Sequence, residues 1–128
     1  EAGGPELIVN LDALTYAGNL RNLESLLGSN QVSFLKADIT DWSAMEQLFK
    51  GKKFDLVFHL AAESHVDRSL YGPNDFVRTN VLGTQHLITA IVQSGHKGVR
   101  FVHISTDEVY GSLGPTGFFV ETTPLDPT

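Results

Sequence analysis

The chain has 128 residues, of which 41% are hydrophobic, so its size and composition are those of one globular domain with a single core. Its formal net charge of −6 at pH 7 disfavours sequence-independent binding to nucleic acid or to an anionic membrane surface. Cysteine is absent and no apolar stretch approaches the roughly 20 residues that span a bilayer, so we expect a cytoplasmic protein with no nucleic-acid or membrane partner.

Two short apolar runs in the first third of the chain predict buried strands. Residues 7–11 follow a Gly-Gly-Pro turn and end at Asp12, and residues 32–36 end before Ala37. Their lengths and their flanking residues are typical of strands in a parallel sheet.

A helix is predicted after the second strand. Asp41 is a candidate N-cap, and apolar residues recur after it at spacings of three and four, which places them on one helix face. These residues are Trp42, Met45, Leu48 and Phe49. Gly51 is expected to end this helix, and residues 54–60 predict a third strand.

A long helix is predicted from about Pro73, which is favoured in a first helical turn, to Ser94. Its expected core stripe comprises Val77, Val81, Thr84, Ile88 and Ile91. A second apolar edge, either a homodimer contact or more core, comprises Phe76, Leu87 and Val92. Residues 99–104 predict a fourth strand.

This alternation of strands and helices predicts an α/β protein with a Rossmann-like, doubly wound parallel sheet. Residues 111–128 are rich in Gly and Pro and predict an extended loop at the end of a partial NAD-binding domain over residues 1–128. A dinucleotide site of this type needs a first strand and a glycine-rich turn before the strand that ends at Asp12. We therefore expect an incomplete sheet and an internal segment of a longer enzyme.

Acidic residues at the ends of the first two strands suggest a cofactor site. Asp12 stands where a dinucleotide-binding sheet places the carboxylate that accepts hydrogen bonds from ribose hydroxyls, which favours NAD over a 2′-phosphorylated cofactor. Asp38 could accept from the exocyclic amine of adenine while Ile39 packs on the ring. Either aspartate could instead be a turn residue or a helix cap.

Small and acidic residues follow the other two strands. Ala61 and Ala62 suit close approach of the backbone to a ring or pyrophosphate, or simply tight packing. Asp107 and Glu108 come directly after the fourth strand, at the sheet edge where ligands bind. If one carboxyl is protonated and the other ionised, the pair can act as general acid and general base. Alternatively, the two residues only form an acidic turn that ends the strand and have no catalytic role. The five histidines are not spaced as a ligand set, so no metal site is predicted.

Five motifs in sequence order resemble the dTDP-glucose 4,6-dehydratases of the extended short-chain dehydrogenase/reductase family. They are residues 10–20, 37–39, 59–69, 79–84 and 103–111. The resemblance runs nearly from end to end, and five ordered motifs are far more specific than any one of them.

The resemblance implies a lyase that uses tightly held NAD to convert dTDP-glucose into dTDP-4-keto-6-deoxy-glucose with loss of water. It implies that sugar C4 gives hydride to NAD, that Glu108 takes the C5 proton, that Asp107 protonates the departing C6 hydroxyl, and that hydride returns to C6. It assigns Ser64 and Thr106 to the substrate. The residues that it assigns to the cofactor are Asp12, Ala13, Leu14, Thr15, Asp38, Ile39, Leu60, Ala61, Ala62, Glu63, Ser64 and Thr79.

The family's glycine-rich loop and its Tyr-x-x-x-Lys pair have no counterpart in these residues, so we expect the 128-residue chain alone to be inactive. One alternative function is a nucleotide-sugar 4-epimerase of the same fold, which needs no acid-base pair for C5 and C6. Another is a nucleotide-binding fragment without catalysis. Family analogy also implies a homodimer formed through the long helix.

Overall fold

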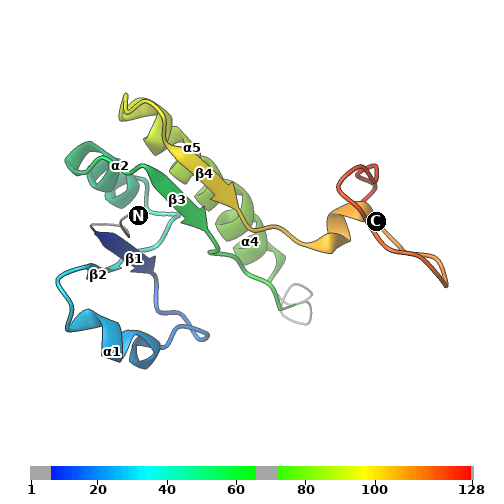
Figure 1. Ribbon diagram of the computed structural model, residues 1–128, viewed down its shortest axis with the longest axis horizontal. Helices are drawn as coiled ribbons and strands as arrows, with labels where there is room; N and C mark the ends of the chain where they lie inside the picture. Colours follow the sequence, from blue (N-terminus) through cyan, green and yellow to red (C-terminus); the bar gives the residue numbers. More distant parts are fainter. Residues whose placement is uncertain (1–6, 66–71, 128) are drawn as a thin grey trace, which may run out of the picture.

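The computed structural model describes residues 7–65 and 72–127, in which strands and helices alternate along the chain (Figure 1). The strands are β1 (Ile8–Asp12), β2 (Val32–Lys36), β3 (Leu56–His59) and β4 (Arg100–His103). The helical elements are η1 (Leu20–Leu23), α1 (Glu24–Leu27), α2 (Trp42–Gly51), α4 (Pro73–Phe76), η2 (Val77–Gly83), α5 (Thr84–Gln93) and η3 (Asp107–Tyr110). The predicted α/β class is confirmed. The expected turn at residues 3–5 and residues 66–69 of the third motif lie outside the described ranges.

The strands form two parallel pairs. β1 pairs with β2, with Ile8 opposite Val32. β3 pairs with β4, with Leu56 opposite Arg100. Because both strands of a parallel pair end at the same edge, the loops that follow them start side by side.

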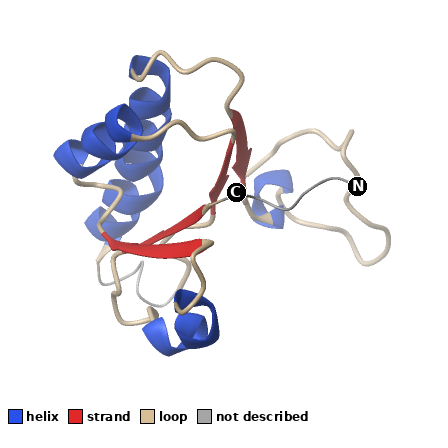
Figure 2. Ribbon diagram, turned by 60° about the vertical axis from the view of Figure 1, so that its left-hand side comes forward, coloured by secondary structure: helices blue, strands red, loops and turns tan. Residues whose placement is uncertain are grey.

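The core lies between α2, α5 and one face of both strand pairs, as Figure 2 shows. Its buried residues are Ile39, Met45, Phe49, Leu87 and Ala90. The strands contribute partly buried side chains to the same cluster, including Leu11, Val57 and Phe101. One core therefore joins the two strand pairs.

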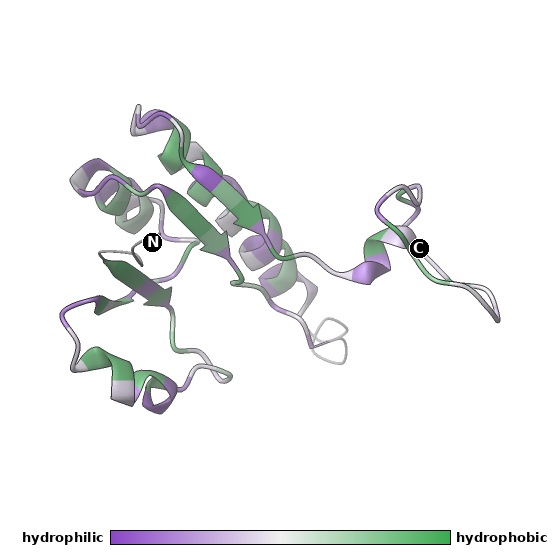
Figure 3. Ribbon diagram, viewed as in Figure 1, coloured by the Kyte–Doolittle hydropathy of each residue, from purple (hydrophilic) through white to green (hydrophobic). Residues whose placement is uncertain are grey.

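The opposite face of the strands is apolar but open. β1 and β3 are hydrophobic along most of their length (Figure 3), and successive side chains of a strand point to opposite faces. Leu56 and Phe58, which flank the core residue Val57, are 43% and 60% exposed. Strands of this composition are typical of parallel sheets that are covered on both faces.

Helix α2 forms as predicted. The Asp41 carboxylate accepts a hydrogen bond from the backbone N–H of Ala44 at 3.1 Å, which satisfies one of the donors left open at the helix N-terminus. Met45 and Phe49 are buried on the expected face, and Gly51 is the last helical residue.

The long helix is continuous from α4 through α5, but η2 in its middle is π-helical, which the sequence did not predict. The expected core stripe is also wrong in part, since Val77, Val81 and Ile88 are 61%, 62% and 45% exposed. The buried positions of η2 and α5 are Gly83, Leu87 and Ala90. Gly83 packs closely against Ile39, and hydropathy alone does not predict that a glycine faces the core.

Residues 111–127 contain no helix or strand and project from the rest of the molecule (Figure 1). The segment returns to its start, because the backbone N–H of Asp126 donates to the carbonyl of Val109 at 3.0 Å. Gly111 has a φ of 79°, and a Cβ there would collide with the carbonyl oxygen of Asp126. Glycine is therefore required where the segment closes.

None of the helices within the described residues is long and apolar enough to cross a membrane.

Candidate functional site

The predicted site residues follow the carboxyl ends of the strands, where open α/β sheets bind their ligands. Residues 13–19 follow β1, and the N–H of Ala37 after β2 donates to the carbonyl of Asp12 at 3.2 Å. Residues 60–65 follow β3, and the N–H of Ile104 after β4 donates to the carbonyl of His59 at 3.0 Å. Each strand pair thus presents two neighbouring loops.

The loop after β1 is held by local hydrogen bonds, one to the Asp12 side chain and one within the backbone. One Asp12 carboxylate oxygen accepts from the N–H of Leu14 at 2.6 Å, and Leu14 has a φ of 53°, in the left-handed region that non-glycine residues rarely adopt. Gly18 donates to the carbonyl of Thr15 at 3.0 Å, and a Cβ on Gly18 would lie 2.6 Å from the Leu14 Cα. The exposed Asp12 keeps its second carboxylate oxygen open to a ligand.

The loop after β2 presents Asp38 and buries Ile39. One Asp38 oxygen accepts from the N–H of Thr40 at 2.8 Å, and the residue is exposed. Ile39 is only 4% exposed and belongs to the core, so its side chain anchors this loop to the helices. The expected contact of Ile39 with an adenine ring stays a prediction.

The loop after β3 is fixed by an asparagine that the sequence analysis did not select. The backbone N–H of Glu63 donates to Oδ1 of Asn80 at 2.8 Å, and Nδ2 of Asn80 donates to the carbonyl of Glu63 at 2.9 Å. We call this pair of hydrogen bonds between Asn80 and Glu63 the clamp. The neighbouring exposed residues are Leu60, Ala61, Ala62 and Ser64. An asparagine in the interior of a helix is the signal that could have indicated the clamp, because asparagine is unfavourable there without a specific partner.

A second missed residue joins the loops of the two strand pairs. The hydroxyl of Tyr16 donates to Oε2 of Glu63 at 2.9 Å. The structure therefore brings the Asp12 loop, Glu63 and Asn80 together, with Thr79 beside Asn80 in the chain.

His59 lies behind this clamp, at the end of β3. Its Nε2 is 2.8 Å from the hydroxyl of Thr84, and that hydroxyl donates to the carbonyl of Asn80 at 2.7 Å. Because a hydroxyl has a single proton, Nε2 of His59 is the donor in this pair. Burial, and secondarily the charge of nearby His103, lower the pKa of His59 below its usual 6.5. The ring is thus held as a neutral hydrogen-bond donor.

The two candidate catalytic acids lie on η3, beyond the end of β4. Thr106 caps this turn, because its hydroxyl oxygen accepts from the N–H of Glu108 at 3.3 Å and the hydroxyl donates to Asp107 at 3.4 Å. Asp107 and Glu108 are exposed. Within the described ranges no hydrogen bond or ion pair joins these acids to Glu63.

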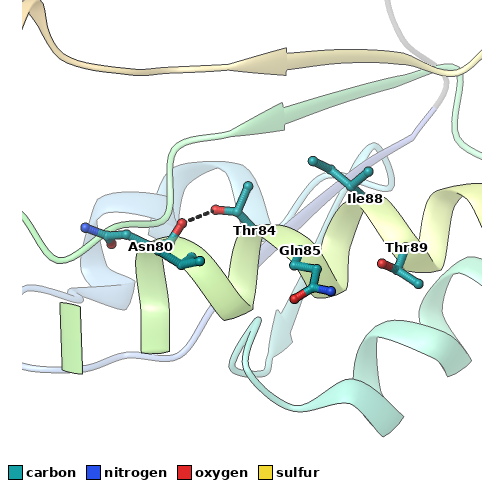
Figure 4. A pocket seen from close by; sticks show the side chains of 6 residues that line it. Asn80, Thr84, Gln85, Ile88 and Thr89 are labelled. Carbon is teal, nitrogen blue, oxygen red and sulfur yellow. Dashed lines mark hydrogen bonds between the residues drawn. The ribbon is translucent and has the colours of Figure 1, made fainter. Parts of the chain in front are cut away.

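A shallow groove of about 390 Å³ runs along the long helix (Figure 4). It is lined by Asn80, Val81, Thr84, Gln85, Ile88 and Thr89. None of the predicted site residues lines it, but Asn80, which does, also holds the loop after β3 through Glu63. In the part of the chain that the structure describes, no three potential metal ligands gather.

Comparison with known proteins gives consistent matches. The family described as GDP-mannose 4,6 dehydratase matches residues 4–128. A dTDP-glucose 4,6-dehydratase of Xanthomonas campestris pv. campestris is 50% identical over 127 residues, which is 94% of this chain and 36% of the relative. The chain therefore spans about a third of the length of this curated relative.

Two solved structures have the same fold over nearly the whole chain. A dTDP-glucose 4,6-dehydratase from Streptomyces venezuelae, with NAD and TYD bound, has a TM-score of 0.86 and 44% identity, covering 97% of this chain and 37% of that one. A UDP-Glc/GlcNAc 4-epimerase from Campylobacter jejuni has a TM-score of 0.81 and 31% identity, covering 94% and 35%. The sheet and helices have the Rossmann-like fold of these structures, and identity is higher to the dehydratase.

Proposed function

Because this chain belongs to the family described as GDP-mannose 4,6 dehydratase, we propose that it is part of a dTDP-glucose 4,6-dehydratase, an NAD-dependent lyase. The observation that carries this is the 50% identity to one such enzyme over 94% of the chain. The product is dTDP-4-keto-6-deoxy-glucose, and one water is lost.

The loops at the strand ends have the chemistry that NAD needs. Asp12 and Asp38 each use one carboxylate oxygen to close a turn, which leaves the other to accept from a ribose hydroxyl or an adenine amine. The exposed Leu60, Ala61 and Ala62 carry no charge that would oppose a ring or pyrophosphate. NAD held by these loops would supply the hydride chemistry, which is oxidation at sugar C4 and reduction at C6.

The acid pair supports the elimination step. Once C4 is a ketone the C5 proton is acidic, so the Glu108 carboxylate suffices as its base, and Asp107 gives the proton with which the C6 hydroxyl leaves as water. Thr106 and Ser64 would hold the sugar. The epimerase alternative has no use for such a pair, and the epimerase structure is also less similar.

Glu108→Gln tests this assignment in a polypeptide of the relatives' length that contains residues 1–128. Without the base, sugar oxidation proceeds but elimination stops, so reduced cofactor accumulates, and turnover falls by about 10²-fold or more. After mixing with dTDP-glucose, near-ultraviolet absorbance measures the reduced cofactor and the keto product, and so measures both the accumulation and the turnover. Glu121→Gln, which neutralises an exposed acid outside the site, should behave like the unsubstituted enzyme; normal turnover in Glu108→Gln would rule out the base.

A homodimer through the long helix belongs to the same proposal. Val77, Val81 and Val92 are 61%, 62% and 72% exposed, and they form an apolar stripe on the helix beside the groove. Burying such a stripe against a second copy removes apolar surface from water. The cytoplasmic location expected from the sequence stays a prediction.

A further inference from the structure

One hydrogen bond links the two strand pairs at their carboxyl ends. The hydroxyl of Tyr16, in the loop after β1, donates to Oε2 of Glu63, in the loop after β3, at 2.9 Å. The two residues are 47 positions apart, and their strands belong to different pairs. The bond therefore spans the ends of both halves of the molecule.

The Tyr16 end of this bond is on a stiff loop. The Asp12 carboxylate holds Leu14, and the left-handed Leu14 and the close approach of Gly18 leave the loop little room to rearrange. The ring of Tyr16 also lies 5.7 Å from the ring of His65, between centroids.

The Glu63 end is anchored through the backbone. Asn80 bonds both the N–H and the carbonyl of Glu63, and these bonds are partly buried. The carbonyl of Asn80 is in turn bonded by Thr84, whose hydroxyl accepts from the buried His59. Asn80 thus fixes the Glu63 backbone to the π-helical turn η2 and leaves its carboxylate to reach Tyr16.

We propose that the Tyr16 to Glu63 hydrogen bond is a bridge over the dinucleotide that slows its release, with Asn80 as the positioning residue. This rests on the proposed function, since the ligand is NAD. Ligands of open α/β sheets lie just outside the carboxyl ends of the strands, which is the place that this bond crosses. Tyr16 is 50% exposed, so the bond can open to solvent and close again without disturbing the core.

The test measures how fast bound NADH leaves a polypeptide of the relatives' length when it is chased with excess NAD. Tyr16→Phe and Glu63→Ala each remove one partner and should speed release by about fivefold, the range expected for the net contribution of one exposed hydrogen bond. The double variant should be no faster than the faster single variant, because both changes remove the same bond. Glu63→Gln keeps an acceptor and should restore most of the slow release.

Asn80→Ala tests the positioning role. This variant leaves Tyr16 and the Glu63 carboxylate intact. If Asn80 positions Glu63 for the bond to Tyr16, Asn80→Ala should speed the release of NADH, and adding Tyr16→Phe should then have no further effect. Glu24→Gln, on α1, is the control for removal of an exposed carboxylate and should release NADH at the unsubstituted rate.

The outcomes separate the bridge from the proposed function. No bound NAD in the unsubstituted protein contradicts both. Stoichiometric NAD with unchanged release from Tyr16→Phe and Glu63→Ala contradicts the bridge alone.

Discussion

His59 shows how one buried polar residue serves both stability and the site. It is 2% exposed, and its ring donates to Thr84, which bonds the backbone of the residue that clamps Glu63. A positive charge on this ring would be almost completely shielded from water, which makes the protonated form unfavourable. Loss of the proton at Nε2 would break the hydrogen bond to Thr84. The imidazole is therefore best accommodated in its neutral form.

This environment predicts a pH dependence of stability. Because the pKa of His59 is lowered in the folded state, the unfolded chain binds a proton first as the pH falls. The free energy of unfolding is then fully retained above the usual histidine pKa of about 6.5 and decreases below it, until the lowered folded pKa is reached.

Urea unfolding at about pH 7 and about pH 5 measures this effect. His59→Gln keeps a donor for Thr84 but does not titrate, so its stability should fall less over this interval than that of the unsubstituted protein. His96→Gln is the matched control and should show the original fall. Equal pH dependence in His59→Gln would mean that other groups cause it.

Local signals made several residues predictable. Asp41 caps α2 as expected because its side chain bonds the backbone three residues ahead, and β2 has the predicted bounds Val32–Lys36. Tyr16 and Asn80 were missed because their partner, Glu63, is distant in sequence. The chemical roles of Asp107 and Glu108 came from the family resemblance and stay proposals.

At the scale of elements, the long helix depends on its approach to the loop after β2. An added Cβ at Gly83 would lie 2.6 Å from both Cδ1 and Cγ1 of Ile39. Ile39 is 4% exposed and packed in the core. Glycine at this position therefore lets the π-helical turn pack against the loop that carries Asp38.

Gly83→Ala tests this packing. The collision should lower the free energy of unfolding by about 1–3 kcal/mol, less up to about 1 kcal/mol gained from the helix propensity of alanine. In an Ile39→Ala background, which removes the colliding atoms, the same change should be nearly neutral. Thermal or urea unfolding measures both.

The control for Gly83→Ala is Gly51→Ala at the end of α2, where a Cβ would meet nothing within 4 Å. It should be neutral or stabilising. The packing account is wrong if Gly83→Ala destabilises equally with and without Ile39→Ala.

The close packing at Gly83 also explains why the sequence analysis assigned the wrong face of the long helix to the core. The sequence has two apolar stripes one position apart, and hydropathy favoured the larger side chains of Val77 and Val81. The buried stripe is the one with Gly83, Leu87 and Ala90, and at Gly83 the close approach of Ile39 leaves no space for a side chain. The π-helical turn is likewise set by contacts between distant elements, which local propensity does not report.

At the scale of the whole molecule, the structure leaves two apolar surfaces open. One is the strand face with Leu56 and Phe58, and the other is the helix stripe with Val81 and Val92. A doubly wound sheet covers both of its faces with helices, so we assign the strand face to further parts of the enzyme and the helix stripe to the partner copy.

The proposed homodimer predicts a clear effect of Val81→Lys in the family-length protein. A charge in the centre of the contact should weaken self-association by tenfold or more, on the order of 1.4 kcal/mol, as measured by sedimentation velocity over a concentration series. Val120→Lys, on the projecting segment, should leave the association unchanged. A Val81→Lys protein that stays dimeric at all concentrations would place the interface elsewhere.

The most direct test of the dehydratase function is NMR analysis of the product formed from dTDP-glucose in deuterated water by a polypeptide of the relatives' length containing residues 1–128. The proposed roles of Glu108 and Asp107 predict a 4-keto-6-deoxy sugar that carries solvent deuterium at C5. The Glu108 carboxylate takes the C5 proton and exchanges it with solvent, and a deuteron is then added to C5 when hydride is added to C6. A product that keeps its C6 hydroxyl and differs from the substrate only in configuration at C4 would contradict the account and assign the chain to an epimerase.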